Sequence, residues 1–187
     1  MMVDVDAHIE KARAEMDHAL EHLSKELSKI RTGKASGALF ENLKVDYYGT
    51  PTPLTQIANI STSDSRTIVI QPWEKKSLAA IERSIFEANM GMTPMNDGEV
   101  VRLTIPPLTE ERRKELVKQA KHLTEDTKVS IRNSRRDCME FIKKATKDGY
   151  PEDMGKVKEK DLQELTNQFG EKAEKLEQAK EKDILTV

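Results

Sequence analysis

The sequence predicts an α+β fold that is mainly α, with a long three-helix bundle interrupted by a small inserted α/β domain. Three observations carry this prediction. Long segments near both ends repeat apolar residues with helical spacing, the middle block has short runs rich in β-branched residues, and a proline pair separates the two patterns. We therefore expect residues 1–31 and 106–187 to form the bundle and residues 32–105 to form the inserted domain.

The first predicted helix occupies most of the N-terminal segment. Apolar residues recur at every seventh position, which describes a narrow seam along a helix of roughly 25 residues. The seam consists of Ile9, Met16, Leu23 and Ile30. Gly33 is expected to end this helix as its C-cap, because glycine adopts the left-handed conformation that many helix ends require.

The middle block is expected to contain three strands and one helix. The runs LKVDYY, RTIVIQ and EVVRLTI have the length and the β-branched or aromatic content of strands. YGTPTPL and NDG are expected to be turns. A helix from about residue 75 to about residue 90, closed by Gly91, is expected between the second and third strands. This order is typical of a small α+β module.

Two more long helices are expected after the proline pair. Thr109 and the two glutamates after it suit a helix start, because a hydroxyl cap and acids in the first turn satisfy the free N–H groups. Over about 38 residues, apolar and small residues then follow two lines: Val117, Thr124, Ile131, Cys138 and Ala145, and Ala120, Thr127, Ser134 and Phe141. After a break at residues 148–151, the last helix carries the apolar residues Leu162, Leu165, Phe169, Ala173, Leu176 and Ala179.

Two short chain segments connect the inserted domain with the bundle. Residues 31–34 contain a glycine, and residues 105–107 contain the two prolines. Short segments at the ends of elements commonly absorb the rotation of one domain against another. We therefore expect a hinge formed by Arg31, Thr32, Gly33, Pro106 and Pro107.

The overall composition excludes several classes of protein. The 187 residues include 31 Lys and Arg and 33 Asp and Glu, for a net charge of −2, so any surface for nucleic acid must be local. Aromatic residues amount to 4%, too few for the stacking platforms that bind single strands. The lone Cys138 excludes an internal disulfide and lies on an expected core line. Because no signal peptide or apolar span is visible, we expect a cytoplasmic protein, and we also expect a monomer.

A local basic surface is expected on the second long helix. With Arg132 at zero and 100° per residue, seven further basic residues fall within about 60° of it: Lys114, Lys118, Lys121, Lys128, Arg135, Arg136 and Lys143. Glu125 is the one acid that interrupts them. On an ordinary solvated face acids and bases are interspersed, as they are on the first and third helices. The segregation predicts an outward ridge that binds the phosphates of a structured RNA or DNA and recognises its shape.

Other patterns carry less weight. His18-Ala-Leu-Glu-His22 matches the H-x-x-E-H pattern of inverted zinc peptidases, but the charged helix offers no third ligand or cleft. We therefore expect solvent-exposed histidines and no metal. No catalytic arrangement of residues is visible, so no cofactor or small-molecule substrate is expected. A helical scaffold or chaperone-like module that binds proteins through its charged helices is the alternative function.

Several of these segments resemble the ribosome recycling factor family over essentially the whole chain. The resemblance is carried by IRTGKA at residues 30–35, YYGTPTPL at 47–54, DSRT at 64–67, PPLTEERR at 106–113 and RNSRRD at 132–137. Lys34 replaces an arginine that is common in the first motif, which retains the charge and loses the bidentate fork.

The resemblance implies a fold, a function and partners. Members of this family have a three-helix bundle and a smaller α/β domain in an L shape similar in outline to tRNA. They bind the large ribosomal subunit after termination and split the ribosome together with elongation factor G and GTP, and they are not enzymes themselves. The bundle, through the arginines of the R-N-x-R-R motif, contacts rRNA. The expected rRNA-binding residues are Arg132, Arg135, Arg136, Lys128, Lys121 and Arg113.

Overall fold

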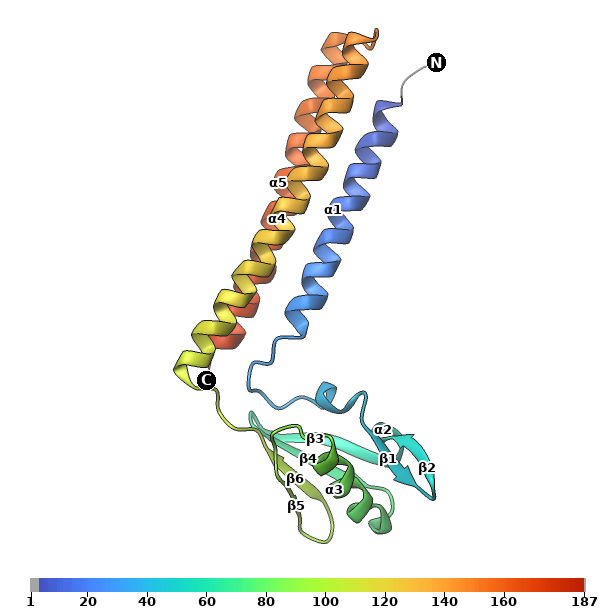
Figure 1. Ribbon diagram of the computed structural model, residues 1–187, viewed down its shortest axis with the longest axis vertical. Coiled ribbons are helices and arrows are strands. Elements are labelled where there is room, and N and C mark those ends of the chain that lie inside the picture. The colour runs from blue at the N-terminus through green and yellow to red at the C-terminus, as the bar shows by residue number, and fades with distance from the viewer. Residues whose placement is uncertain (1–3, 187) are drawn as a thin grey trace. The chain divides into compact units, whose positions relative to one another are not determined.

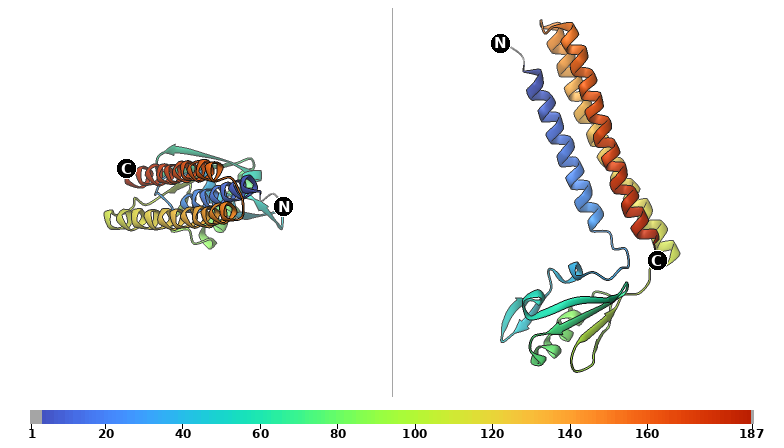
Figure 2. Two further views of the ribbon diagram at one scale, coloured as in Figure 1. Left: turned by 90° about the horizontal axis from the view of Figure 1, so that it is seen from above. Right: turned by 180° about the vertical axis from the view of Figure 1, so that it is seen from behind.

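The computed structural model describes residues 4–186, which divide into two compact units (Figures 1 and 2). The first unit contains the described residues up to Arg31 and those from Glu110 onward, and the second is Thr32–Thr109. Each unit has its own apolar core. The prediction of a mainly helical α+β fold, with a three-helix bundle interrupted by a small α/β domain, is confirmed.

Three long helices form the first unit: α1 (Val5–Ser28), α4 (Glu110–Lys147) and α5 (Glu152–Leu185). They lie side by side in both figures. Their narrow apolar seams face one another, so that each helix covers the seams of the other two. The core that results includes Val5, Met16, Ile131, Ile142, Leu162 and Phe169.

The first helix ends earlier than the sequence predicts. Asp4 caps its N-terminus, where the side-chain Oδ1 accepts a hydrogen bond from Ala7 N at 3.0 Å. The helix ends at Ser28, and the chain beyond it leaves the bundle. The prediction that Gly33 caps this helix is therefore wrong. Gly33 has a φ of +75° in the second unit, where Leu108 approaches so closely that a Cβ would lie 3.0 Å from its Cγ.

The buried face of α4 deviates slightly from the predicted lines. Val117 and Phe141 are half-buried, and their neighbours Leu116 and Ile142 are buried instead. A straight α-helix has 3.6 residues per turn, so a line of every seventh residue turns away from the seam by about 20° per heptad. In α5, Ala179 was predicted in the seam and is exposed.

Hydroxyl side chains in the bundle core are all hydrogen-bonded. The buried Thr124, Thr127 and Thr166 each donate to the carbonyl oxygen four residues earlier, at 2.8–3.1 Å. Ser134 Oγ of α4 donates to Glu15 Oε2 of α1 at 2.8 Å. A buried hydroxyl is costly only when it lacks a partner, so these residues are compatible with the core.

The second unit is a small antiparallel sheet covered by a helix. Strands β3 (Ala58–Asp64), β4 (Thr67–Pro72), β6 (Val101–Thr104) and β5 (Pro94–Asn96) form the sheet in that order, and β1 (Lys44–Tyr47) and β2 (Thr50–Pro53) form a separate hairpin. Helix α3 buries Ile81 and Ile85 in a core that also contains Ile70 and Leu103. The elements in chain order are η1 (Gly37–Phe40), β1 (Lys44–Tyr47), β2 (Thr50–Pro53), α2 (Leu54–Ile57), β3 (Ala58–Asp64), β4 (Thr67–Pro72), η2 (Lys75–Ser77), α3 (Leu78–Glu87), β5 (Pro94–Asn96) and β6 (Val101–Thr104).

The three strands predicted in the middle block are confirmed as β1, β4 and β6. Strand β3 was missed because it exposes mainly polar residues without an alternating pattern, and β5 was missed because it is only three residues long. YGTPTPL was wrongly assigned as a turn throughout, since Thr50–Pro53 pairs with β1 as β2. The helix predicted to reach residue 90 ends at Glu87, because Asn89 adopts a left-handed φ of +48°.

Both chain segments that enter and leave the second unit are bound to the turn between β3 and β4. Ala35 N donates to Ser65 O at 2.8 Å, and Ile105 N donates to Arg66 O at 2.7 Å. The second unit therefore extends past the predicted boundary at residue 105 and ends at Thr109, which places Pro106 and Pro107 within it.

Asp64 orders this turn. Its Oδ1 accepts a hydrogen bond from Arg66 N at 2.9 Å, and its Oδ2 accepts one from the Thr67 hydroxyl at 3.0 Å. Because these bonds favour the charged carboxylate, with the Arg66 amide the larger contributor, they hold the pKa of Asp64 below its usual range.

We expect Gly33→Ala to destabilise the second unit by about 1–3 kcal/mol, because alanine would retain a strained positive φ and would press against Leu108. Gly37→Ala is the matched control, since its φ is not positive and the nearest atom to its Cβ is 3.8 Å away. Amide hydrogen exchange in β4 and β6 measures the opening free energy of both variants. Equal exchange would show that the segment accepts a side chain at Gly33.

We expect the stabilisation from Asp64 to disappear in acid. Its folded pKa is lowered, so the carboxylate stabilises the fold above the unfolded pKa, and this stabilisation is lost as the pH falls through the folded pKa. Asp64→Asn retains an acceptor oxygen without the charge. Its thermal midpoint should lie below that of the wild type at neutral pH and should approach it once the pH falls below the lowered folded pKa of Asp64. A difference that does not change with pH would contradict this role.

Candidate nucleic-acid interface

Eight basic residues of α4 form a continuous stripe on its outer side, which we call the basic ridge. Most of them point to solvent, and Lys128 and Arg135 form the edge of the stripe next to the buried Ile131. Lys128 and Arg135 are half-buried and the other six are exposed. At 1.5 Å per residue the stripe is about 40 Å long. The basic ridge consists of Lys114, Lys118, Lys121, Lys128, Arg132, Arg135, Arg136 and Lys143.

Acidic side chains neutralise part of the basic ridge. Arg132 Nη2 lies 3.0 Å from Glu125 Oε1, and both side chains are more than half exposed, at 58% and 59%. Exposed ion pairs contribute little to stability, so a phosphate can replace Glu125 at small cost. Lys128 is paired with Glu174 of α5, an acid that a projection of α4 alone could not reveal.

Arg135 and Arg136 are held by amides rather than by acids. Arg135 Nη1 donates to Gln163 Oε1 of α5 at 3.4 Å, and Arg136 Nη2 donates to Asn133 Oδ1 at 3.1 Å. Each of these bonds uses one of the five N–H donors of a guanidinium. The two arginines are therefore oriented without loss of charge, which suits phosphate binding.

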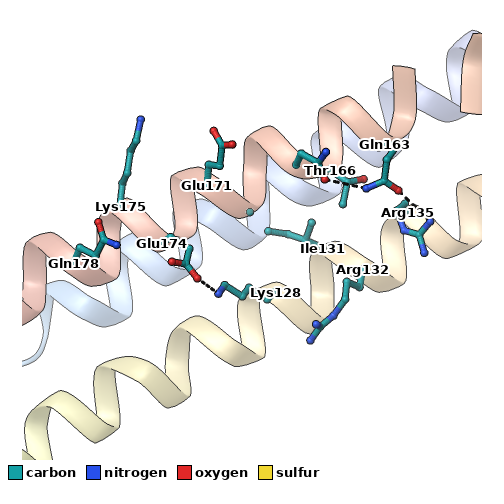
Figure 3. Close-up of a pocket in the computed structure, with 12 residues that line it drawn as sticks. Lys128, Ile131, Arg132, Arg135, Gln163, Thr166, Glu171, Glu174, Lys175 and Gln178 are labelled. Carbon is teal, nitrogen blue, oxygen red and sulfur yellow. Dashed lines mark hydrogen bonds and ion pairs between the residues drawn. The ribbon is translucent and has the colours of Figure 1, made fainter. Parts of the chain in front are cut away.

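A groove of about 790 Å³ lies between α4 and α5 beside the basic ridge (Figure 3). The Lys128–Glu174 ion pair crosses from one helix to the other, and so does the Arg135–Gln163 hydrogen bond about two helical turns further along. Between these crossings Ile131 extends from α4 towards α5. Further lining residues are Arg132, Thr166, Asn167 and Gly170. The groove is therefore continuous with the ridge and is crossed by two polar bridges.

One predicted rRNA-binding residue does not lie on the basic ridge. Arg113 is about 100° around the helix from Arg132 and is half-buried. Its Nε is enclosed and has no hydrogen-bond partner within residues 4–186. Five of the six predicted rRNA-binding residues, including Lys121, therefore lie on the basic ridge, and Arg113 lies apart from them.

Of the predicted hinge residues, only Arg31 belongs to the first unit, and Thr32, Gly33, Pro106 and Pro107 belong to the second. Arg31 is exposed and is the last residue of the first unit before the chain enters the second. Thr32 and Gly33 are half-buried, whereas Pro106 and Pro107 are exposed.

The two histidines of the H-x-x-E-H pattern and the lone cysteine remain to be placed. His18 and His22 are exposed, which confirms that prediction. In the described part of the chain, no three His, Cys, Asp or Glu side chains are grouped as metal ligands would be. Cys138 is buried, and burial, followed by the charge of Glu15, raises the pKa of its thiol. Within residues 4–186 no helix combines the length and apolar character needed to span a bilayer.

The sequence analysis missed the contribution of α5 to this surface. Gln163, Asn167, Gly170 and Glu174 line the groove from a helix whose charges alternate in sequence and carry no distinctive pattern. The one feature of the α5 sequence that could have indicated a site is Gly170. Glycine within a helix lowers its stability by about 1 kcal/mol relative to alanine, so it is unusual there without a packing or functional reason. The remaining contacts depend on how α4 and α5 pair.

Comparison with known proteins gives matches along nearly the whole chain. A family model described as Ribosome recycling factor matches residues 23–185. The ribosome-recycling factor of Parabacteroides distasonis is 48% identical over 187 residues, which cover 100% of both chains. That of Oleidesulfovibrio alaskensis is 48% identical over 184 residues, or 98% of this chain and 100% of the relative.

Two solved structures are similar over almost the full length. A solution structure of the ribosome recycling factor has a TM-score of 0.75 and 39% identity, with 100% of each chain covered. The other has a TM-score of 0.61 and 40% identity, with 97% of this chain and 99% of the other covered. It belongs to models of the T. thermophilus ribosome recycling factor and the E. coli elongation factor G bound to the E. coli post-termination complex.

Proposed function

The chain belongs to the ribosome recycling factor family, and we propose that it binds the large ribosomal subunit after termination through the basic ridge. With elongation factor G and GTP it splits the post-termination ribosome, so that the subunits can begin another round of translation. The family membership supports this function over the alternative of a helical scaffold. The single observation that supports the binding surface is the outward segregation of basic residues along α4.

The chemistry of the basic ridge suits RNA phosphates. Arg132, Arg135 and Arg136 present planar guanidinium groups within about one and a half helical turns, and each can grip a phosphate through two N–H groups. Lys121 and Lys128 extend the positive surface along the same side of α4. The chain itself acts by binding and is not an enzyme, because GTP is hydrolysed by the partner factor. On this proposal it works in the cytoplasm.

We also propose that the two short chain segments between the units act as a hinge. Ala35 and Ile105 are both held by the β3–β4 turn, so the rotation is assigned to Arg31 and Thr32 on one side and to the end of the second unit at Thr109 on the other. Pro106 and Pro107 keep the second segment stiff, because proline has a fixed φ.

Arg132→Glu combined with Arg135→Glu should abolish measurable binding to isolated large subunits while the fold is retained. Each phosphate contact by a charged donor contributes about 1.5–3 kcal/mol, and the two glutamates add repulsion. Lys11→Glu with Lys25→Glu on the exposed face of α1 is the matched control, since it changes the net charge equally. Co-sedimentation measures binding, and circular dichroism with thermal melting measures the fold.

The salt dependence of binding provides a second readout of the same variants. The slope of log affinity against log salt should be steep for the wild type and for the α1 control. In a ridge variant it should be shallower by about 0.7–0.9 for each phosphate that the protein no longer neutralises. Wild-type affinity and slope in the double ridge variant would show that the basic ridge is not the binding surface.

Electron–electron distance measurements between spin labels should reveal the hinge. Labels on Glu21→Cys in α1 and Glu99→Cys in the second unit, in a Cys138→Ala background, should give a broad distance distribution. Labels on Glu21→Cys and Lys160→Cys, both within the bundle, are the control and should give a narrow one. Equally narrow distributions for both pairs would rule out a hinge.

A further inference from the structure

We propose that the groove between α4 and α5 receives the base of one unpaired nucleotide of the RNA whose phosphates lie on the basic ridge. This inference rests on the proposed function and adds a contact with a base to a surface that otherwise recognises the backbone. It is argued from an unexplained glycine, from the size of the groove and from the side chains on its walls.

Gly170 is the first observation. Glycine within a helix destabilises it relative to alanine, so its presence there calls for a reason. Gly155, also in α5, has one, since a Cβ would lie 2.7 Å from Thr146 Oγ1. At Gly170 no positive φ occurs and a Cβ would meet no atom within 4 Å. Neither backbone geometry nor packing therefore requires this glycine. What it does is leave the wall of the groove bare, which allows a ligand to approach the helix backbone closely.

The groove has the volume and the position for a nucleotide. Its volume of about 790 Å³ falls in the range of about 300–1,000 Å³ that is usual for sites of drug-sized ligands. Lys128, Arg132 and Arg135 belong both to its lining and to the basic ridge. A nucleotide whose phosphate is held by Arg132 and Arg135 therefore has the groove directly beside it. In Figure 3 Arg132 extends to the outer side of α4, where a backbone phosphate would lie.

The walls of the groove suit a base rather than a second phosphate. Gln163 Oε1 accepts from Arg135, and Gln163 Nε2 donates to Asn167 Oδ1 at 2.9 Å. This chain fixes the orientation of both amides and points the Asn167 NH2 group away from Gln163. Asn and Gln amides are the side chains that pair with base edges, and unpaired RNA bases expose those edges. Ile131 and Thr166, which are both almost fully buried, form the floor of the groove beneath these amides.

The acids near the groove do not oppose a nucleotide. Glu174 is neutralised by its ion pair with Lys128. Glu171 and Lys175 extend away from α4 in Figure 3, so neither charge points into the space between the helices. On the α4 side the groove is lined by the basic residues Lys128, Arg132 and Arg135. On the α5 side the lining combines the amides of Gln163 and Asn167 with Glu171, Glu174 and Lys175, so a phosphate is favoured on the α4 side and a base beside the amides.

The test compares the full-length wild type with Gly170→Leu, which fills the groove, and with Gln168→Leu. Gln168 is an exposed neighbour on α5 that does not line the groove, so it is the matched control. Each protein is bound to isolated large ribosomal subunits. Hydroxyl-radical cleavage then maps protection of the rRNA backbone, and reagents that modify unpaired base edges map protection of bases.

We expect the wild type and Gln168→Leu to protect a backbone segment and at least one unpaired base within it. Gly170→Leu should protect the same backbone but leave that base reactive, and its Kd should be about tenfold weaker, within the factor of roughly 5 to 150 that a base-edge contact provides. Leucine favours the helix more than glycine does, so the melting temperature of the Gly170→Leu variant should not fall below that of the wild type. If it does fall, Gln163→Ala with Asn167→Ala removes the amides from an open groove, and the same loss of base protection is expected.

Two results would overturn the inference and leave the proposed function intact. One is a wild-type backbone footprint without any protected unpaired base. The other is base protection and affinity that remain unchanged both in Gly170→Leu and in the double amide variant. Failure of the proposed function looks different, because the backbone footprint itself would then be absent from the wild type or would persist in the Arg132→Glu, Arg135→Glu variant.

Discussion

The helical repeat of α4 is the constraint on which both the core and the candidate interface depend. This one helix of 38 residues carries the seam that α1 and α5 cover and, on its other side, the basic ridge. One inserted residue would rotate everything beyond it by about 100° and would exchange part of the seam for part of the ridge. Ile131 and Arg132 illustrate the constraint, since adjacent residues serve the core and the surface.

A second constraint operates where the chain enters and leaves the small unit. The turn that Asp64 orders accepts hydrogen bonds from Ala35 and Ile105, and Gly33 gives Leu108 room to approach. The two segments are thereby held together on the second unit before the chain reaches the bundle. An insertion with its two ends fixed close to each other can fold on its own core without disturbing the register of the helices around it.

The groove shows that the interface is not a property of α4 alone. Gln163 of α5 orients Arg135, and Glu174 of α5 forms an ion pair with Lys128. Helix α5 therefore determines which basic residues of the ridge are available to a ligand. Gly170 belongs to the same arrangement, because the surface it leaves open faces the basic residues of the neighbouring helix. With glycine at position 170, α5 is less stable than it would be with a larger side chain. Such a loss of stability is common at binding sites.

The three long helices, strands β1, β4 and β6, and the outward basic ridge could be predicted from the sequence, because each depends on a local period or a local composition. The prediction from sequence failed at Gly33, since a left-handed glycine suits a helix end as well as a close contact with Leu108. It also failed at β3, whose exposed residues are ordered by pairing with β4. The pairing of Lys128 with Glu174, the enclosure of Arg113 Nε and the groove beside Gly170 became visible only in the packed structure. These features arise between residues far apart in the chain, and no periodicity within one helix specifies which residues of another helix it will face.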